Sequence, residues 1–98
     1  MKQNLETIKE QLKYHLPRLK KDFSVEEIGI FGSVAQGRDK PKSDVDILVD
    51  FSRPPGFIGF MKLEEYLSQV LGKKVDLVTK NALKKLVKDE ILHQLIYV

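Results

Sequence analysis

The sequence contains no cysteine and no apolar stretch long enough to cross a bilayer. The lack of cysteine excludes a disulfide scaffold, a cysteine-ligated zinc site and a thiol nucleophile. The residues after Met1, KQNLETIKEQLK, do not form a secretory signal peptide. Arginine is scarce beside lysine and no aromatic spacing suggests base stacking, which disfavours a nucleic-acid-binding module. We therefore expect a cytoplasmic protein that engages neither membrane nor nucleic acid.

The 98 residues, 42% of them hydrophobic, suffice for the core of one domain spanning residues 1–98 and are too few for two domains. The net charge of +3 is too small to identify a partner by itself. We find no repeat, low-complexity tract or linker. A first helix is indicated by one apolar stripe, with Pro17 expected to separate its long part from a further turn. The stripe consists of Leu5, Ile8, Leu12, Leu16 and Leu19.

The rest of the chain alternates between strand and helix patterns. Strands are predicted at residues 25–32, 43–51, 73–79 and 95–98, and helices at 58–71 and from Asn81, the expected N-cap, onward. A short helical turn is expected between Gly32 and Gly37. This order predicts an α/β (α+β) fold in which a single small mixed β-sheet packs against helices.

Two aspartates interrupt the strand pattern SDVDILVDF. Asp44 and Asp46 lie on the same side of the strand and are separated by about 6.6 Å along it. Carboxylates are unfavourable in strands and repel each other, so such a pair is more typical of a site for Mg²⁺ or Mn²⁺ than of a fold-stabilising feature. Two ions about 3.5–4 Å apart would serve in-line phosphoryl displacement. The alternative interpretation is a solvated polar face.

Three further residues extend the candidate site. Asp76 lies within the apolar run Val75, Leu77 and Val78, and would face the same cations if its strand pairs with the Asp44–Asp46 strand. It would then be a third ligand or the base that receives a proton. Gly32 and Ser33 follow a strand, where a helical turn offers N–H groups and a hydroxyl to phosphate oxygens.

The order Gly-Ser, ten residues, Asp-x-Asp resembles the signature of the DNA polymerase beta-like nucleotidyltransferase superfamily. The segments IFGSVAQG, SDVDILVDF, LEEYLSQVLGKKVDLVT and ILHQLIYV resemble its minimal nucleotidyltransferase (MNT) branch over nearly the whole chain. The resemblance implies the polymerase beta-like fold. It also implies that Gly32 and Ser33 bind the nucleotide's triphosphate. Asp44, Asp46 and Asp76 would be the catalytic triad and the ligands of two Mg²⁺ (or Mn²⁺) ions.

The resemblance also implies a reaction and a partner. Minimal nucleotidyltransferases of this kind act as antitoxins of HEPN toxins, and the expected reaction is transfer of AMP from ATP to a hydroxyl of that partner protein. Gln36 departs from the family pattern, which commonly has arginine at this position, and Arg38, Lys40 or Lys42 could compensate. The departure motivates an alternative function, in which a catalytically weak or inactive module neutralises the partner by binding alone.

Overall fold

Helices and strands alternate along the described chain of the computed structural model, which covers residues 5–38, 40, 43–86 and 94–98. This order confirms the predicted α/β fold. The part of the fourth predicted helix beyond residue 86 lies outside the described residues, as does Lys42. The elements are α1 (Leu5–Phe23), β1 (Val25–Phe31), α2 (Gly32–Ala35), β2 (Val45–Phe51), α3 (Gly56–Leu71), β3 (Val75–Thr79), α4 (Lys80–Leu86) and β4 (Ile96–Tyr97).

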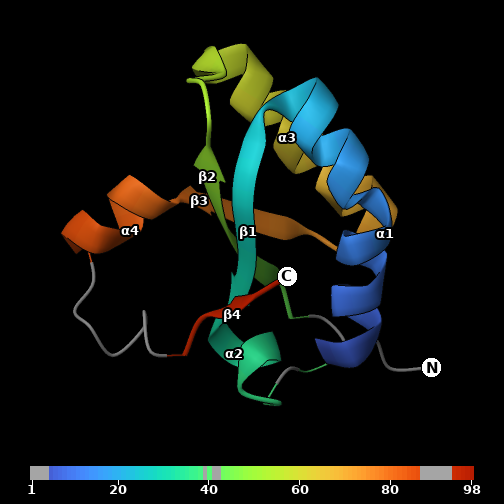
Figure 1. The fold of residues 1–98 in the computed structure, drawn as a ribbon. Coiled ribbons are helices and arrows are strands. Elements are labelled where there is room, and N and C mark those ends of the chain that lie inside the picture. The colour runs from blue at the N-terminus through green and yellow to red at the C-terminus, as the bar shows by residue number, and fades with distance from the viewer. Residues whose placement is uncertain (1–4, 39, 41–42, 87–93) are drawn as a thin grey trace.

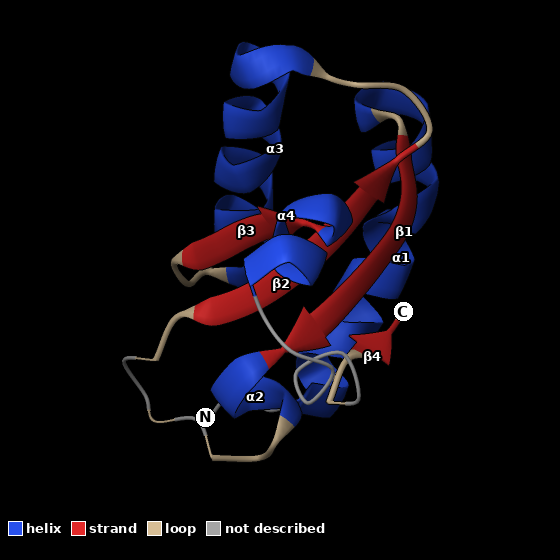
Figure 2. Ribbon diagram, turned by 90° about the vertical axis from the view of Figure 1, so that its left-hand side faces the viewer, coloured by secondary structure: helices blue, strands red, loops and turns tan. Residues whose placement is uncertain are grey.

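The strands form one mixed sheet in the order β3-β2-β1-β4. β1 runs antiparallel to both β2 and β4, whereas β2 and β3 are parallel and are joined by α3. A parallel pair requires such a crossover because a short turn cannot return the chain to the same end of the sheet. α1 and α3 cover one face of the sheet and α4 lies on the other (Figures 1 and 2). The expected mixed sheet is therefore confirmed.

The main core lies between the sheet and the α1–α3 layer. The apolar stripe predicted for the first helix and the apolar face of α3 point into it, because residues three or four apart share a helix face. Burial of each Leu, Ile or Val side chain contributes about 1.5–3 kcal/mol. The fully or nearly fully buried members are Ile8, Leu12, Leu19, Val25, Ile28, Ile30, Val34, Val45, Ile47, Val49, Leu63, Leu67, Leu71, Val75 and Leu77.

A second, smaller cluster occupies the other face of the sheet. It consists of Phe31 from β1, Leu48 from β2 and Leu83 from α4. Because successive residues of a strand point to opposite faces, Leu48 is buried on the face that also carries Asp46. Side chains of β2 therefore alternate between the two faces of the sheet. Val45, Ile47 and Val49 are buried against α1 and α3, and Leu48 is buried on the α4 face between Asp46 and Asp50.

Two local predictions were wrong. α1 continues through Pro17 to Phe23, so the proline removes one helical hydrogen bond without ending the helix. α4 begins at Lys80, one residue before the expected cap Asn81. The Thr79 hydroxyl oxygen accepts a hydrogen bond from the main-chain N–H of Ala82 at 3.1 Å and thereby serves as the cap.

Side chains of α3 hold the outer edge of β3. The Ser68 hydroxyl accepts a hydrogen bond from the Val75 N–H at 3.1 Å, and the Glu64 carboxylate accepts one from the Leu77 N–H at 3.2 Å. These bonds pair N–H groups that an edge strand otherwise leaves open, and so keep β3 in register beside β2. Among the described helices, none has both the length and the apolar character needed to span a membrane.

Candidate active site

Three carboxylates meet where β2 and β3 begin. Asp46 is the second residue of β2 and lies directly beside Asp76 in the parallel register of β2 and β3. Asp44 precedes β2 by one residue and shares the alternation of Asp46. Asp44 and Asp76 are exposed, whereas Asp46 is half-buried. On the β1 side, Asp46 is paired with Phe31. The strand of Asp76 therefore pairs with that of Asp46, which is the condition that the prediction for Asp76 required.

The neighbouring carboxylates affect the ionisation of Asp46. Burial, followed by the negative charges of Asp76 and then Asp44, raises the pKa of the Asp46 carboxyl above its ordinary value. A like charge nearby disfavours ionisation, and removal from water adds to this effect. A divalent cation would reverse the balance because it attracts all three carboxylates.

The Gly32 turn lies against this cluster. Gly32 has a φ of +75°, in the left-handed region that favours glycine. A Cβ atom at Gly32 would overlap the Asp46 carboxylate oxygen and lie only 3.0 Å from its Cγ. The lack of a side chain therefore lets the main chain at the start of α2 approach Asp46. Next to it, the half-buried Ser33 makes no side-chain hydrogen bond within the described part of the protein.

The donor set suits Mg²⁺ or Mn²⁺, which prefer carboxylate oxygens. Within the described residues, no group of three or more His, Asp or Glu side chains is arranged so that it could hold a metal ion by itself. An open set fits the expected chemistry, because Mg²⁺ in nucleotide-transferring sites is usually held by one or two carboxylates together with substrate phosphates. Gly32 leaves room for close approach to Asp46, and so the residues present fit a metal-bound nucleotide.

A hydrogen-bonded chain of side chains adjoins the turn. Gln36 accepts a hydrogen bond from the Arg38 guanidinium and donates one to the Gln94 side-chain oxygen. The main-chain N–H of Arg38 also donates to the Ser33 carbonyl oxygen at 2.8 Å. The sequence singled out Gln36 and Arg38, but it contained no signal for Gln94, because the contact joins residues 58 positions apart.

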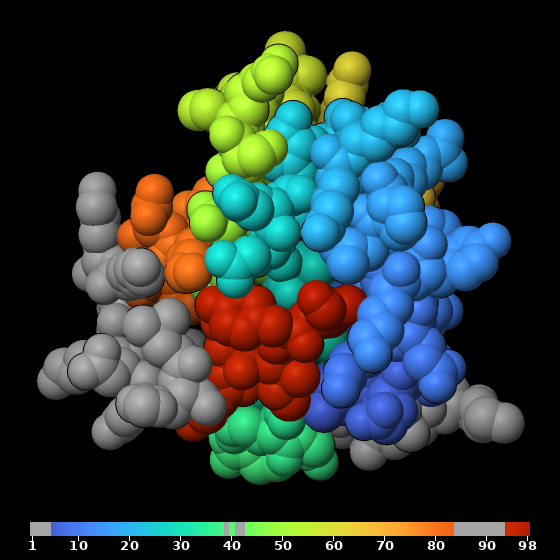
Figure 3. Space-filling model, viewed as in Figure 1, coloured from blue at the N-terminus to red at the C-terminus, as the bar shows by residue number. Residues whose placement is uncertain are grey.

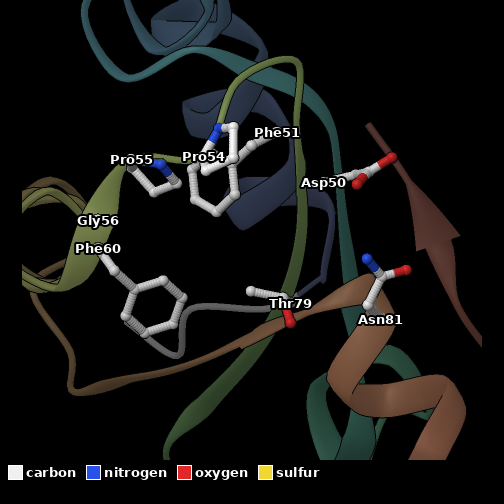
Figure 4. A pocket seen from close by; sticks show the side chains of 8 residues that line it. All are labelled: Asp50, Phe51, Pro54, Pro55, Gly56, Phe60, Thr79 and Asn81. Atoms are coloured by element: carbon white, nitrogen blue, oxygen red, sulfur yellow. The ribbon is translucent and has the colours of Figure 1, made fainter.

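A separate pocket of about 360 Å³ lies at the opposite ends of β2 and β3. It contains none of the predicted site residues. Phe51, Phe60 and the Pro54–Pro55 loop surround it on one side, and Asp50, Thr79 and Asn81 on the other (Figure 4). Asp50 shares the strand of Asp46 but sits about 13 Å further along, which excludes it from the carboxylate cluster.

Comparison with known proteins reveals similarity over most of the chain. A family model described as "Nucleotidyltransferase domain" matches residues 12–98. Protein adenylyltransferase MntA of Thermococcus cleftensis is 47% identical over 94 residues, which cover 96% of this chain and 95% of the MntA chain. A protein of Methanocaldococcus jannaschii assigned as a protein adenylyltransferase, MJ0128, is 48% identical over 92 residues, with 93% and 94% covered.

Solved structures share the fold. A protein assigned as a minimal nucleotidyltransferase superposes with a TM-score of 0.79 and 29% identity, over 96% of this chain and 95% of its own. A chain of a toxin–antitoxin crystal structure with AMP-PNP gives 0.70 and 25%, over 87% and 70%. A chain from the tri-AMPylated Shewanella oneidensis HEPN toxin in complex with MNT antitoxin gives 0.64 and 21%, over 92% and 70%, which is a likeness of fold.

Proposed function

The chain belongs to the nucleotidyltransferase-domain family, and from that premise we propose that it transfers AMP from ATP to a hydroxyl group of a partner protein. One observation carries the proposal. Asp46 and Asp76 stand side by side on parallel strands while the Gly32 main chain lies against Asp46. A phosphate-binding turn and a carboxylate cluster thus meet at one point, as transfer of a nucleotidyl group requires.

The proposed roles follow from these positions. Asp44, Asp46 and Asp76 hold Mg²⁺ or Mn²⁺ ions, which neutralise phosphate charge and polarise the phosphorus when bound. Gly32 and Ser33 bind the triphosphate through the main chain at the start of α2 and through the Ser33 hydroxyl, which has no hydrogen-bond partner among the described residues. Asp76, exposed at the edge of the cluster, also receives the proton of the acceptor hydroxyl.

The reaction balances without a covalent enzyme intermediate. The acceptor oxygen forms a bond to the α-phosphorus of ATP, the bond from that phosphorus to the bridging oxygen breaks, and pyrophosphate leaves. The hydroxyl proton passes to the Asp76 carboxylate. The chain's contribution is to position the reactants and to neutralise charge, which suffices because the nucleotide already carries a good leaving group.

A labelling experiment tests the proposal. The protein is incubated with α-³²P-labelled ATP, Mg²⁺ or Mn²⁺ and the protein product of its neighbouring gene, and we expect label on that partner. Asp44→Asn and Asp46→Asn should each lower labelling by about 100-fold or more, because each removes a charged ligand. Asp50→Asn on the same strand is the matched control and should label normally. A folded wild-type protein that leaves the partner unlabelled would refute the proposed activity.

We further propose that the partner is a HEPN toxin, so that the transfer acts as an antitoxin mechanism. The resemblance to minimal nucleotidyltransferases supports this, as does the likeness to a chain of a toxin–antitoxin structure with AMP-PNP. Cells that express the toxin should be protected by the wild-type protein and not by an Asp44→Asn, Asp46→Asn double variant. Protection by the folded double variant would instead favour neutralisation by binding alone.

A further inference from the structure

The side-chain amide of Gln36 is occupied at both ends. Its oxygen faces Arg38 because a guanidinium group donates hydrogen bonds and cannot accept them. Its nitrogen therefore faces the Gln94 oxygen, which accepts the remaining bond. The C-terminal segment 94–98 lies on the surface immediately beside α2, with β4 paired to β1 (Figure 3). Gln36 thus links the turn after α2 to a segment that is distant in sequence.

Arg38 is held at two points. Its main-chain N–H donates to the Ser33 carbonyl oxygen at 2.8 Å, and its side chain donates to Gln36. Gly37, with a φ of +70°, lets the chain reverse between Gln36 and Arg38. The exposed Arg38 side chain therefore lies against Gln36 at the end of α2, the short helix whose first residue, Gly32, lies against Asp46.

Within the described part of the chain, no carboxylate compensates the charge of Arg38. Among the described residues it forms no ion pair with a carboxylate, whereas Arg18 pairs with Asp22 at 3.2 Å. A neutral amide contacts the Arg38 guanidinium without cancelling its charge, and the described residues leave most of its five N–H donors without a partner. An arginine held in this way is suited to a phosphate group, which accepts two parallel hydrogen bonds.

We propose that Arg38 binds a phosphate group of the nucleoside triphosphate and that Gln36, supported by Gln94, is the residue that positions it. The nucleotide part of this inference rests on the proposed function, whereas phosphate binding itself does not. The C-terminal segment becomes part of the nucleotide site through Gln94, although its strand lies at the edge of the sheet away from β3.

Binding measurements test the role of Arg38. Affinities for inorganic tripolyphosphate and for Mg²⁺–ATP are measured by calorimetry on the full chain. Arg38→Ala should weaken both by about 10- to 100-fold, the range for a hydrogen bond between charged groups. Arg38→Lys keeps the charge but lacks the planar fork, and should lose less. Arg53→Ala, which removes an exposed arginine beyond β2, is the matched control and should bind both probes normally.

A double-mutant cycle separates positioning from general structure. Gln36→Leu should weaken tripolyphosphate binding by about 3- to 10-fold in the wild-type background. In the Arg38→Ala background it should have no further effect, because there is no guanidinium left to position. Gln36→Glu should weaken binding more than Gln36→Leu, since a carboxylate pairs with Arg38 and repels phosphate. In the transfer reaction, KM for ATP should rise more than kcat falls.

The outcomes distinguish this inference from the proposed function. Normal tripolyphosphate and ATP binding by folded Arg38→Ala would overturn it while AMP transfer by the wild type stood. Arg38-dependent tripolyphosphate binding without any AMP transfer would uphold it and refute the proposed function. A Gln36→Leu effect that persists undiminished without Arg38 would show that Gln36 supports the turn and does not position Arg38.

Discussion

Replacement of Gly32 by alanine tests the contact on which the candidate site depends. The new Cβ would overlap the Asp46 carboxylate oxygen, with the Asp46 Cγ at 3.0 Å and its Cβ at 3.2 Å. Because the residue also has a φ of +75°, the substitution adds left-handed backbone strain. Gly37 offers a matched control, since its φ is +70° but nothing lies within 4 Å of a Cβ built there.

The two glycines allow the strain and the contact to be separated. Gly37→Ala should lower the free energy of unfolding by about 1–2 kcal/mol through backbone strain alone. Gly32→Ala should lower it by about 1–2 kcal/mol more, because the Asp46 side chain must leave its preferred rotamer or the turn must move away. Urea unfolding resolves this difference, which corresponds to a midpoint shift of roughly 1 M at an m value near 1.5 kcal/mol/M.

A second pair of variants assigns the additional loss to Asp46. In an Asp46→Ala background the carboxylate atoms are gone and only the Cβ contact at 3.2 Å remains, so most of the additional loss from Gly32→Ala should disappear. In an Asp46→Asn background the shape is retained and the additional loss should persist. Equal losses for Gly32→Ala and Gly37→Ala in the wild type, or no coupling with Asp46→Ala, would refute the close approach of turn and carboxylate.

Three further predictions concern other parts of the structure. The pKa of Asp46 is raised in the folded protein, so its ionisation opposes folding and stability falls as the pH rises above the ordinary value of 3.8. Without metal, Asp46→Asn should therefore raise the free energy of unfolding at pH 7 and lose that advantage below pH 3.8. Asp50→Asn is the control, and an equal effect of Asp46→Asn at both pH values would contradict this prediction. Gly29→Ala would place a Cβ 2.9 Å from Leu95 Cδ1, which would push the segment that carries β4 away from β1. The main-chain amides of β4 should then exchange hydrogen with solvent faster, and an unchanged exchange rate would exclude a tight contact. The Lys73 ammonium nitrogen is buried and has no hydrogen-bond partner among the described residues. Lys73→Met should therefore raise the free energy of unfolding, measured by thermal melts, by about 1–3 kcal/mol. A lower free energy of unfolding would contradict this prediction.

Local patterns in the sequence predicted the elements because their causes are local. The period of 3.6 in residues 5–23 and the alternation in residues 45–51 follow from the direction of successive side chains, and both were observed. Predictions from local sequence were wrong at the start of α4, where two neighbouring residues can each cap the helix, and at Pro17 in α1. Thr79 caps α4 in place of Asn81, and α1 continues through Pro17 because flanking apolar residues on both sides of the proline pack into the same core.

The sequence by itself determined which residues are candidates for chemistry: the spacing from Ser33 to Asp44 and Asp46, and a third acid at position 76 within an apolar strand. Only the tertiary structure decided that these residues meet. Asp46 and Asp76 are adjacent because β2 and β3 pair in parallel across α3, and the register depends on packing of the whole α3–sheet layer. The contact of Gly32 with Asp46 and the bond from Gln36 to Gln94 likewise join distant segments, for which no local pattern exists.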